Sequence, residues 1–274
     1  MPVTIGALGE RASGEMRVSL VPEIADKLSS GGARVLIERG AGVKAQFPDG
    51  LYRKVEWADS AATVLAAADV LLTVQPLEVD QIQALKSGAV VIGFMPAHAR
   101  RAEVQALRDC NITSFAMELV PRISRAQSMD ALSSQASIAG YKAVLIAANT
   151  LDRFLPMLTT AAGTIRPAQV LIVGVGVAGL QAIATARRLG AVVEAYDVRS
   201  ATREQVKSLG AKFVDTGVSA EGSGGYAREL TEEERRRQQE VLDARIALAD
   251  AVITTAAIPG RAAPRIVSAA AVRR

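Results

Sequence analysis

The sequence predicts an α/β protein of two doubly wound parallel-sheet domains joined by a long helix. Short apolar runs rich in β-branched residues alternate with helix-forming runs along both halves of the chain, as in parallel strands linked by crossover helices. The length of 274 residues fits about two domains of ~150 residues each. Apolar residues make up 50% of the chain and aromatic residues only 4%, so the cores must be mainly aliphatic.

The first domain is predicted to span residues 1–127 and to hold five parallel strands. Its apolar runs are separated by helix-forming segments and loops that leave no room for hairpins. The predicted strands are 3–8, 34–38, 69–74, 89–94 and 113–117. The predicted helices are 22–29, 60–68, 79–85 and 101–109. No glycine fingerprint for a nucleotide follows these strands.

The stretch that follows residue 169 is the most informative part of the chain. Val170–Val173 is a short apolar run typical of a strand buried on both faces. Gly174, Gly176 and Gly179 then give G-x-G-x-x-G, and a helix-forming run leads to a second apolar run at 192–196. In such a unit the first glycine permits a tight turn, the second lets the backbone approach a pyrophosphate, and the third lets the helix pack on the strand. The helix N-terminus then offers N–H groups to the diphosphate.

A carboxylate ends the second strand of this unit. Asp197 lies at the distance from the glycines at which an acid accepts a hydrogen bond from the adenosine ribose 2′-OH. Because it would repel a 2′-phosphate, Asp197 predicts NAD(H) over NADP(H). Arg199 points weakly the other way, since a nearby arginine is what accommodates that phosphate elsewhere.

A long helix, 128–151, is predicted to join the first domain to the second, which spans residues 128–274. Gln127, Asp130 and Ser134 fall at i, i+3 and i+7, on one face of a helix. A polar helical face is ordinarily solvated, and the spacing alone favours that interpretation. The position between two domains favours a ligand site instead, because ligands bind in clefts there.

The rest of the second domain is predicted to add two strands and one capped helix. The strands are 211–214 and 251–256, and Thr231 with Glu234 forms a capping box that opens the helix. A glycine-rich stretch around Tyr226 is either a spacer or a lid that closes over a ligand.

Charge and composition exclude several classes of protein. The net charge is +4 and the pI about 9.4, but no basic stripe is present, so nucleic-acid binding is not predicted. A single cysteine, Cys110, excludes an internal disulfide and a cysteine metal cluster, and no metal site is predicted. Glu10 and Arg11 stand where a signal peptide would be apolar. The uncharged run 167–186 has the length of a membrane span, but its ordered glycines predict a buried strand and helix in a soluble chain.

Three motifs carry a resemblance to a known family. They are PRISRAQSMDALSSQ (121–135), GVGVAGLQAIATARRLGAVVEAYDVR (174–199) and GGYAREL (224–230). With them the chain closely resembles the NAD(H)-binding component of proton-translocating NAD(P)+ transhydrogenase, in the alanine dehydrogenase/transhydrogenase family. The resemblance spans nearly the whole chain and implies two Rossmann-like domains.

The resemblance implies a set of site residues. Arg122, Gln127, Asp130 and Ser133 match family residues that face the nicotinamide and its ribose and set the ring for hydride transfer. Residues implied to contact the rest of the bound NAD(H) are Ser128, Met129, Gly174, Gly176, Val177, Ala178, Gly179, Asp197, Val198, Arg199, Gln238 and Ala257. Gly225 and Tyr226 match a mobile loop that closes over the nucleotide.

The resemblance also implies partners and a location. The component works as a homodimer beside an NADP(H)-binding subunit and a membrane-spanning proton-channel subunit, so the chain is expected to be cytoplasmic and peripheral on the inner membrane. The family continues past the position that matches Arg274 with a further strand and a return segment. The second domain is therefore expected to be truncated, with strand 251–256 at an edge.

The residues leave three functions open. Oxidising an amine or alcohol requires a general base, and the one histidine is His98, whereas alanine dehydrogenases carry a lysine and a histidine at positions that match Val74 and Pro96. Hydride passage between two nicotinamide rings moves no proton at the reacting carbons, so positioning suffices and transhydrogenation is favoured. The alternatives are an alanine-type amino-acid dehydrogenase, with His98 as base and Arg17 on the substrate carboxylate, and a non-catalytic NAD(H)-sensing module.

Overall fold

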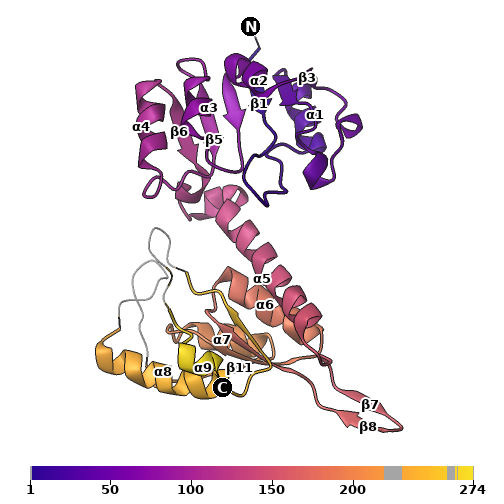
Figure 1. Ribbon diagram of the computed structural model, residues 1–274, viewed down its shortest axis with the longest axis vertical. Helices are drawn as coiled ribbons and strands as arrows, with labels where there is room; N and C mark the ends of the chain where they lie inside the picture. The colour runs from indigo at the N-terminus through magenta and orange to yellow at the C-terminus, as the bar shows by residue number, and fades with distance from the viewer. Residues whose placement is uncertain (1, 219–229, 258–262, 264, 274) are drawn as a thin grey trace. The chain divides into compact units, whose positions relative to one another are not determined.

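The chain divides into two compact units, Met1–Ala131 and Leu132–Arg274 (Figure 1). The computed structural model describes residues 2–218, 230–257, 263 and 265–273. Among these residues, no helix combines the length and the apolar character that crossing a membrane requires. The uncharged run 167–186 instead forms a buried strand and most of a helix.

The first unit contains a six-stranded parallel sheet in the order β3-β2-β1-β4-β5-β6. Its strands are β1 (Thr4–Ala7), β2 (Arg34–Glu38), β3 (Glu56–Ala58), β4 (Val70–Leu72), β5 (Val90–Gly93) and β6 (Thr113–Ala116). The chain winds outward from β1 to one edge and then returns to build the other half from β4. This reversal defines a doubly wound sheet, and it leaves a crevice at the carboxyl ends of β1 and β4.

The helices of the first unit begin where the local sequence favours a helix start. Pro22 occupies the first turn of α1 (Pro22–Ser30), and the Ser60 side chain caps α2 (Ala61–Ala67) by accepting from the Thr63 N–H at 3.3 Å. The remaining α-helices are α3 (Val79–Gln83) and α4 (Arg101–Asp109), and the 3₁₀-helices are η1 (Val43–Ala45), η2 (Asp49–Leu51), η3 (Met117–Leu119) and η4 (Ser124–Met129).

The central strands of the first sheet are buried on both faces, whereas the edge strand β6 is largely exposed. Side chains alternate along each strand, so Leu36 packs in one core cluster with residues of α2, α3 and α4, while Val35 and Ile37 pack in the other with Ala25 of α1. These continuous apolar strands, covered on both sides, are what made the first unit recognisable from sequence.

The second unit repeats the beginning of that topology. Its parallel sheet has the order β11-β10-β9-β12, built from β9 (Gln169–Val173), β10 (Val192–Tyr196), β11 (Lys212–Phe213) and β12 (Ala251–Thr254). β12 ends the order of the described strands. A separate antiparallel hairpin, β7 (Leu158–Thr160) with β8 (Gly163–Ile165), extends away from this sheet (Figure 1).

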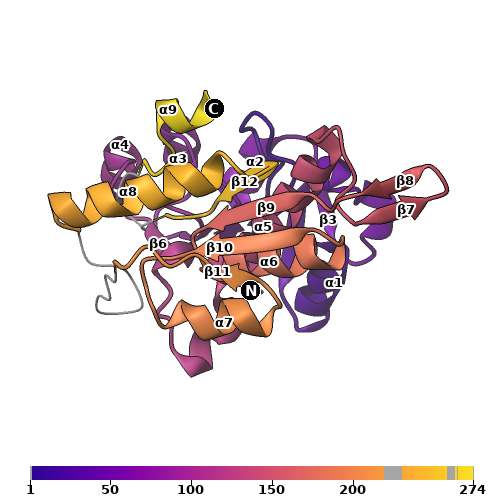
Figure 2. The same ribbon diagram turned by 90° about the horizontal axis from the view of Figure 1, so that it is seen from below.

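Helices cover both faces of the second sheet. Figure 2 shows α8 on one side of the strands and α6 and α7 on the other, and two separate core clusters correspond to these faces. The helices are α5 (Ala131–Thr150), α6 (Val177–Arg188), α7 (Thr202–Ser208), α8 (Glu232–Ile246) and α9 (Ala269–Val272). The capping box predicted for Thr231 and Glu234 is confirmed, because Thr231 N–H donates to Glu234 Oε2 at 2.9 Å and Glu234 N–H donates to Thr231 Oγ1 at 3.3 Å.

The predicted fold class is confirmed, but three short strands were not predicted. β3 was not predicted, because it has only three residues, one of them the charged Glu56. The hairpin β7–β8 was not predicted either, because its strands are short and largely exposed and so lack an apolar alternation.

The predicted start of the connecting helix was wrong. Residues Ser124–Met129 form the 3₁₀-helix η4, Asp130 has ψ 81°, and α5 begins at Ala131. Serine and aspartate compete for backbone hydrogen bonds and favour helix starts over helix interiors. Gln127 and Asp130 therefore do not share an α-helical face with Ser134.

The core of the first unit can be tested at Leu71, which is 0% exposed. Leu71→Ala should lower the free energy of unfolding of this unit by about 2–5 kcal/mol, because it leaves a cavity. Leu119→Ala, at a side chain 73% exposed, is the matched control and should change it by less than about 0.5 kcal/mol. Urea unfolding followed by the fluorescence of Trp57, the one tryptophan, reports on this unit. Equal effects of the two substitutions would contradict the core assignment.

Candidate nucleotide-binding site

The candidate site lies at the carboxyl end of β9, where the second sheet reverses its winding. β9 pairs with β10 on one side and with β12 on the other, and both pairings are parallel. β9 and β12 end side by side where the winding of the sheet reverses, and the crevice at such a point is where doubly wound proteins bind ligands.

Gly174 makes the turn out of β9 in a conformation that other residues rarely adopt. Its φ is +100°, and an added Cβ would lie 2.7 Å from the backbone nitrogen of Ala256. The Thr255 hydroxyl donates to the Gly174 carbonyl at 2.8 Å, and the Gly174 N–H donates to the Tyr196 carbonyl at 2.8 Å. The turn is thus held by the strand ends on both sides of it.

Gly176 and Gly179 serve different purposes, as the sequence predicted for a dinucleotide fingerprint. An added Cβ at Gly179 would lie 1.9 Å from the Gly174 carbonyl oxygen, so close packing of helix on turn requires glycine there. An added Cβ at Gly176 would have no heavy atom of the described residues within 4 Å. Packing among the described residues therefore does not account for glycine at 176. The exposed backbone at this position leaves room for the close approach of a ligand.

The N-terminus of α6 can receive a diphosphate. Gly176 is its N-cap, and the first hydrogen bond of the helix runs from the Leu180 N–H to the Gly176 carbonyl at 2.9 Å. The N–H groups of Val177, Ala178 and Gly179 precede that bond and have no partner within the helix. Together with the helix dipole they form an anion site beside the Gly176 backbone.

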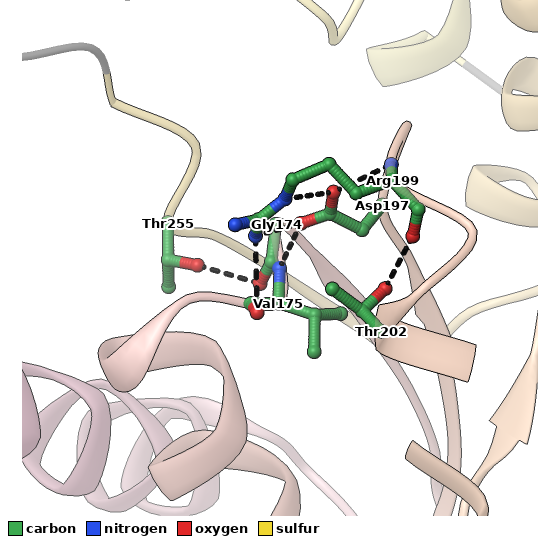
Figure 3. A network of polar contacts seen from close by, with 6 residues as sticks. All are labelled: Gly174, Val175, Asp197, Arg199, Thr202 and Thr255. Carbon is green, nitrogen blue, oxygen red and sulfur yellow. Dashed lines mark hydrogen bonds and ion pairs between the residues drawn. The ribbon is translucent and has the colours of Figure 1, made fainter. Parts of the chain in front are cut away.

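Asp197 lies beside this turn and is fully occupied by hydrogen bonds (Figure 3). Its Oδ2 accepts from the Val175 N–H at 2.8 Å and from Arg199 Nη2 at 2.8 Å. Its Oδ1 accepts from the Arg199 N–H at 2.9 Å and from Arg199 Nε at 2.8 Å. Because a carboxylate has about four acceptor positions, a ribose hydroxyl could bind Asp197 only if Arg199 gave up a hydrogen bond.

The same contacts decide the charge of Asp197, which is 7% exposed. Burial alone would raise the pKa of this carboxyl, but the hydrogen bonds from Arg199 and from the Val175 N–H outweigh burial and hold the pKa below its ordinary value. Asp197 is therefore ionised at neutral pH, and its charge is balanced by Arg199.

A pocket of about 100 Å³ adjoins Asp197 at the carboxyl ends of β10 and β11. Within it Arg203 Nη2 donates to Asp215 Oδ2 at 2.5 Å, and the Arg203 guanidinium lies 5.1 Å from the ring centre of Phe213. The residues that line the pocket are Tyr196, Asp197, Ser200, Arg203, Phe213, Asp215, Thr216, Gly217 and Val218. Of these residues, the sequence predicts only Asp197 as part of the site. A sequence pattern that could have identified the others is their position, since most of them follow β10 or β11, two strands that end at the same crevice.

Gln238 of α8 lies beside Tyr196, a residue that lines this pocket. The Tyr196 hydroxyl is buried, and burial raises its pKa, while the neighbouring side chains of Thr216 and Gln238 act in the opposite direction. No described residue makes a hydrogen bond of ordinary geometry to that hydroxyl. Because Tyr196 also lines the pocket, Gln238 lies near the pocket, and its role in binding stays a prediction.

A larger hollow, of about 430 Å³, lies elsewhere in the second unit. It is lined by Ile246, Ala247, Ala249, Val252, Thr254, Val267, Ala271 and Val272. None of these residues has an ionisable side chain, and Thr254 is the one polar side chain among them. The glycine turn and Asp197 remain the better candidate despite their smaller pocket.

The other predicted site residues are distributed over both units. Arg122 and Asp130 form an ion pair with Nε and Oδ2 3.7 Å apart in the first unit, where Gln127, Ser128 and Met129 lie exposed on η4. Ser133 lies in the first turn of α5, Val198 follows β10, and Ala257 is exposed after β12. Gly225 and Tyr226 lie outside the described residues.

The crevice of the first unit is filled by its own polar side chains. Glu10 accepts from the N–H groups of Val74 at 2.6 Å and Gln75 at 3.1 Å. Glu15 accepts from Arg17 Nε at 2.7 Å, from Arg17 Nη2 at 2.6 Å and from Gln75 Nε2 at 2.6 Å. The Arg17 guanidinium and the Gln75 amide, which could bind a small anion in this crevice, are therefore engaged with carboxylates of the chain.

These contacts shift the two carboxyl groups in opposite directions. Burial raises the pKa of Glu10, although the N–H groups of Val74 and Gln75 oppose the shift. The hydrogen bonds from Arg17 lower the pKa of Glu15 to about 2, against the opposing effect of burial. Both groups contribute to the structure of the crevice through these hydrogen bonds.

Comparison with known proteins matches both units. The N-terminal domain family of alanine dehydrogenase/PNT matches residues 6–139, and the C-terminal domain family matches residues 143–274. The chain is 49% identical over 270 residues to the first part of NAD(P) transhydrogenase subunit alpha of Rhodospirillum rubrum, in an alignment that covers 94% of this chain and 70% of that one.

A solved structure and a more distant relative agree with this match. The crystal structure of transhydrogenase from Sinorhizobium meliloti aligns with a TM-score of 0.87 and 46% identity, covering 98% of this chain and 74% of the other. Alanine dehydrogenase of Mycobacterium tuberculosis is 28% identical over 269 residues, which is 96% of this chain and 67% of that protein. Similarity to transhydrogenase subunits therefore exceeds similarity to this dehydrogenase.

The pairing of Asp197 with Arg199 predicts a change of nucleotide preference. In Asp197→Ala the guanidinium loses its carboxylate partner and can attract a 2′-phosphate, so NADPH should bind about tenfold more tightly and NADH more weakly. Fluorescence titration with each nucleotide measures both affinities. The control is Asp197→Ala combined with Arg199→Ala, which should lose the gain for NADPH. Unchanged affinities in the single variant would show that Asp197 does not read the ribose.

The low pKa of Glu15 predicts a loss of stability in acid. Since the pKa is about 2 in the folded chain and ordinarily 4.5, the stabilisation is complete above pH 4.5 and is lost as the pH falls toward 2. Glu15→Gln should be less stable than the parent at pH 7, and the difference should shrink as the pH falls through this range. Urea unfolding followed by Trp57 fluorescence at several pH values checks this. Glu23→Gln, at an exposed position of α1 in the same unit, should show no such convergence.

Proposed function

The chain belongs to the alanine dehydrogenase/PNT family, and from this we propose that it is the NAD(H)-binding component of a proton-translocating NAD(P)+ transhydrogenase. In this role it holds NADH while hydride passes to NADP+ on a partner subunit. The observation that carries the proposal is the open backbone of Gly176 at the N-terminus of α6, beside an ionised Asp197. The similarity of the chain to transhydrogenase subunits supports hydride transfer between nucleotides as the reaction.

In the proposed complex, the second domain, residues 128–274, binds the dinucleotide along the carboxyl edge of its sheet. The N–H groups of Val177, Ala178 and Gly179 hold the pyrophosphate. Asp197, Val198 and Arg199 hold the adenosine ribose, with Arg199 yielding one of its hydrogen bonds to the ribose hydroxyl. Gln238, Ala257 and the Gly225–Tyr226 segment complete the proposed binding residues.

In the proposed reaction, the protein must position the two nicotinamide rings, and it need not transfer a proton. Bound NADH supplies the hydride, and no proton is exchanged at the reacting carbons. Arg122, Gln127, Asp130 and Ser133 orient the nicotinamide and its ribose by hydrogen bonds, with Ser128 and Met129 beside them. Orientation of this kind is sufficient to lower the barrier of a direct transfer. The Arg122–Asp130 ion pair favours a fixed arrangement of two of these side chains.

An alanine-type dehydrogenase is the main alternative, and the first unit lacks two features that it needs. Val74 and Pro96 have no side-chain group that can take a proton, and His98 is exposed on a turn. Arg17, the candidate for a substrate carboxylate, is bound to Glu15 through two hydrogen bonds. Oxidation of NADH by the isolated protein that depends on pyruvate and ammonia would establish this alternative and overturn the proposal.

The proposal includes the assembly and location of the component. We propose that the chain acts as a homodimer, cytoplasmic and peripheral on the inner membrane, attached through an NADP(H)-binding subunit and a membrane-spanning proton-channel subunit. Recovery of NADH-dependent activity in a membrane fraction only when all subunits are present would support this arrangement.

The deciding experiment titrates the chain with NADH and NADPH and then adds the NADP-binding partner. Selective NADH binding, with hydride transfer that appears only with the partner, is expected. NADH binding without transfer in the complete complex would instead indicate a non-catalytic sensing module. Absence of NADH binding would overturn the proposal.

The positioning role predicts a specific effect at Gln127. Gln127→Asn shortens the side chain by one methylene and should slow hydride transfer by about 10- to 100-fold while changing NADH affinity much less, because a misplacement of ~1 Å affects orientation more than binding. Single-turnover transfer rates and fluorescence titration separate the two effects. Gln83→Asn, at an exposed position of α3, is the control. Equal losses in rate and affinity would contradict the positioning role.

A further inference from the structure

A fourth glycine belongs to the region of the fingerprint, although it lies on another helix. Gly140 is buried in the middle of α5, where glycine is less favourable than any ordinary residue except proline. A glycine inside a helix usually has a packing reason. Here the reason is a crossing with α6 within the second unit.

α5 and α6 meet backbone to backbone at this crossing. A Cβ added to Gly140 would lie 2.0 Å from the carbonyl oxygen of Ala178, 2.8 Å from its carbonyl carbon and 3.0 Å from its Cα. One turn earlier on α5, the Ser137 hydroxyl donates to Gln181 Oε1 at 3.4 Å. Because the atoms near Gly140 are backbone atoms of α6, no side-chain rotation could make room for a methyl group.

The carbonyl that Gly140 contacts belongs to the peptide group that carries the Gly179 N–H. The peptide unit is planar and rigid, so a displacement of the Ala178 oxygen also moves that N–H. Gly179 is confined on its other side, since a Cβ there would lie 1.9 Å from the Gly174 oxygen. The first turn of α6 is thus held between the turn after β9 and the backbone of α5.

We propose that Gly140 is a positioning residue of the nucleotide site, which aims the N–H groups at the start of α6 toward the pyrophosphate. The inference rests on the proposed binding of NAD(H) at α6 and adds to it a residue outside the fingerprint. It predicts a selective defect, because the contact governs the anion-binding N–H groups and not the pocket beside Asp197. Ligands that carry a diphosphate should therefore depend on Gly140, and a ligand without phosphate should not.

The test compares NADH, ADP and adenosine as ligands of the full chain. Gly140→Ala should weaken NADH and ADP binding by about tenfold or more and change adenosine binding by less than about twofold. Calorimetric titration measures the three affinities, and thermal unfolding confirms that the variant is folded. Ala139→Gly is the control at the neighbouring exposed position: it should lower the melting temperature, since glycine weakens a helix, and leave the three affinities unchanged.

A second variant covers the case in which Gly140→Ala does not fold. Ser137→Leu places a bulkier side chain against Gln181 at the same crossing and should weaken diphosphate ligands more than adenosine, by less than Gly140→Ala because the Gln181 side chain can rotate. An equal loss for ADP and adenosine, or no loss for either, in a folded variant would overturn the role of Gly140 and leave the proposed function intact. A parent chain that binds neither NADH nor ADP would overturn both.

Discussion

The candidate site depends on a steric constraint at the end of β9, where three strand ends and two helices meet with almost no side chain between them. The Gly174 backbone is bonded to the Tyr196 carbonyl of β10 and to the Thr255 hydroxyl that follows β12. Gly179 must pack against the Gly174 carbonyl. Because Gly174 is held by hydrogen bonds from both neighbouring strand ends and Gly179 packs directly on its carbonyl, these contacts fix the direction in which α6 leaves the sheet. The anion-binding N–H groups follow from that direction.

The two units share a winding pattern but use their crevices differently. In the second unit, the crevice presents exposed backbone at Gly176 and the start of a helix, which favour a phosphate. In the first unit, Glu10 and Glu15 already occupy the N–H, amide and guanidinium donors of the crevice. A doubly wound sheet therefore provides a place for a ligand, and the local donors decide whether a ligand or the chain itself fills it.

The nucleotide preference that we propose for this site depends on two neighbouring charges, those of Asp197 and Arg199. Asp197 is ionised because Arg199 and the Val175 N–H stabilise its charge in a buried position. The same arginine uses acceptor positions that a ribose hydroxyl would need. Asp197 disfavours a 2′-phosphate by its charge, and it also keeps Arg199 from attracting one. The preference for NAD(H) that we propose therefore belongs to the pair of residues.

The sequence alone determined the fold class, the central strands of both sheets, the glycine turn and the carboxylate beside it. Strands buried on both faces and a helix that begins at a fixed glycine spacing depend on neighbours in the chain, so they leave a local pattern. Tertiary structure alone decided the short edge strand at Glu56, the engagement of Asp197 by Arg199, and the closeness of Gly140 to Ala178. These features depend on which backbone groups meet in space, and residues distant in the chain leave no periodic signal of that meeting.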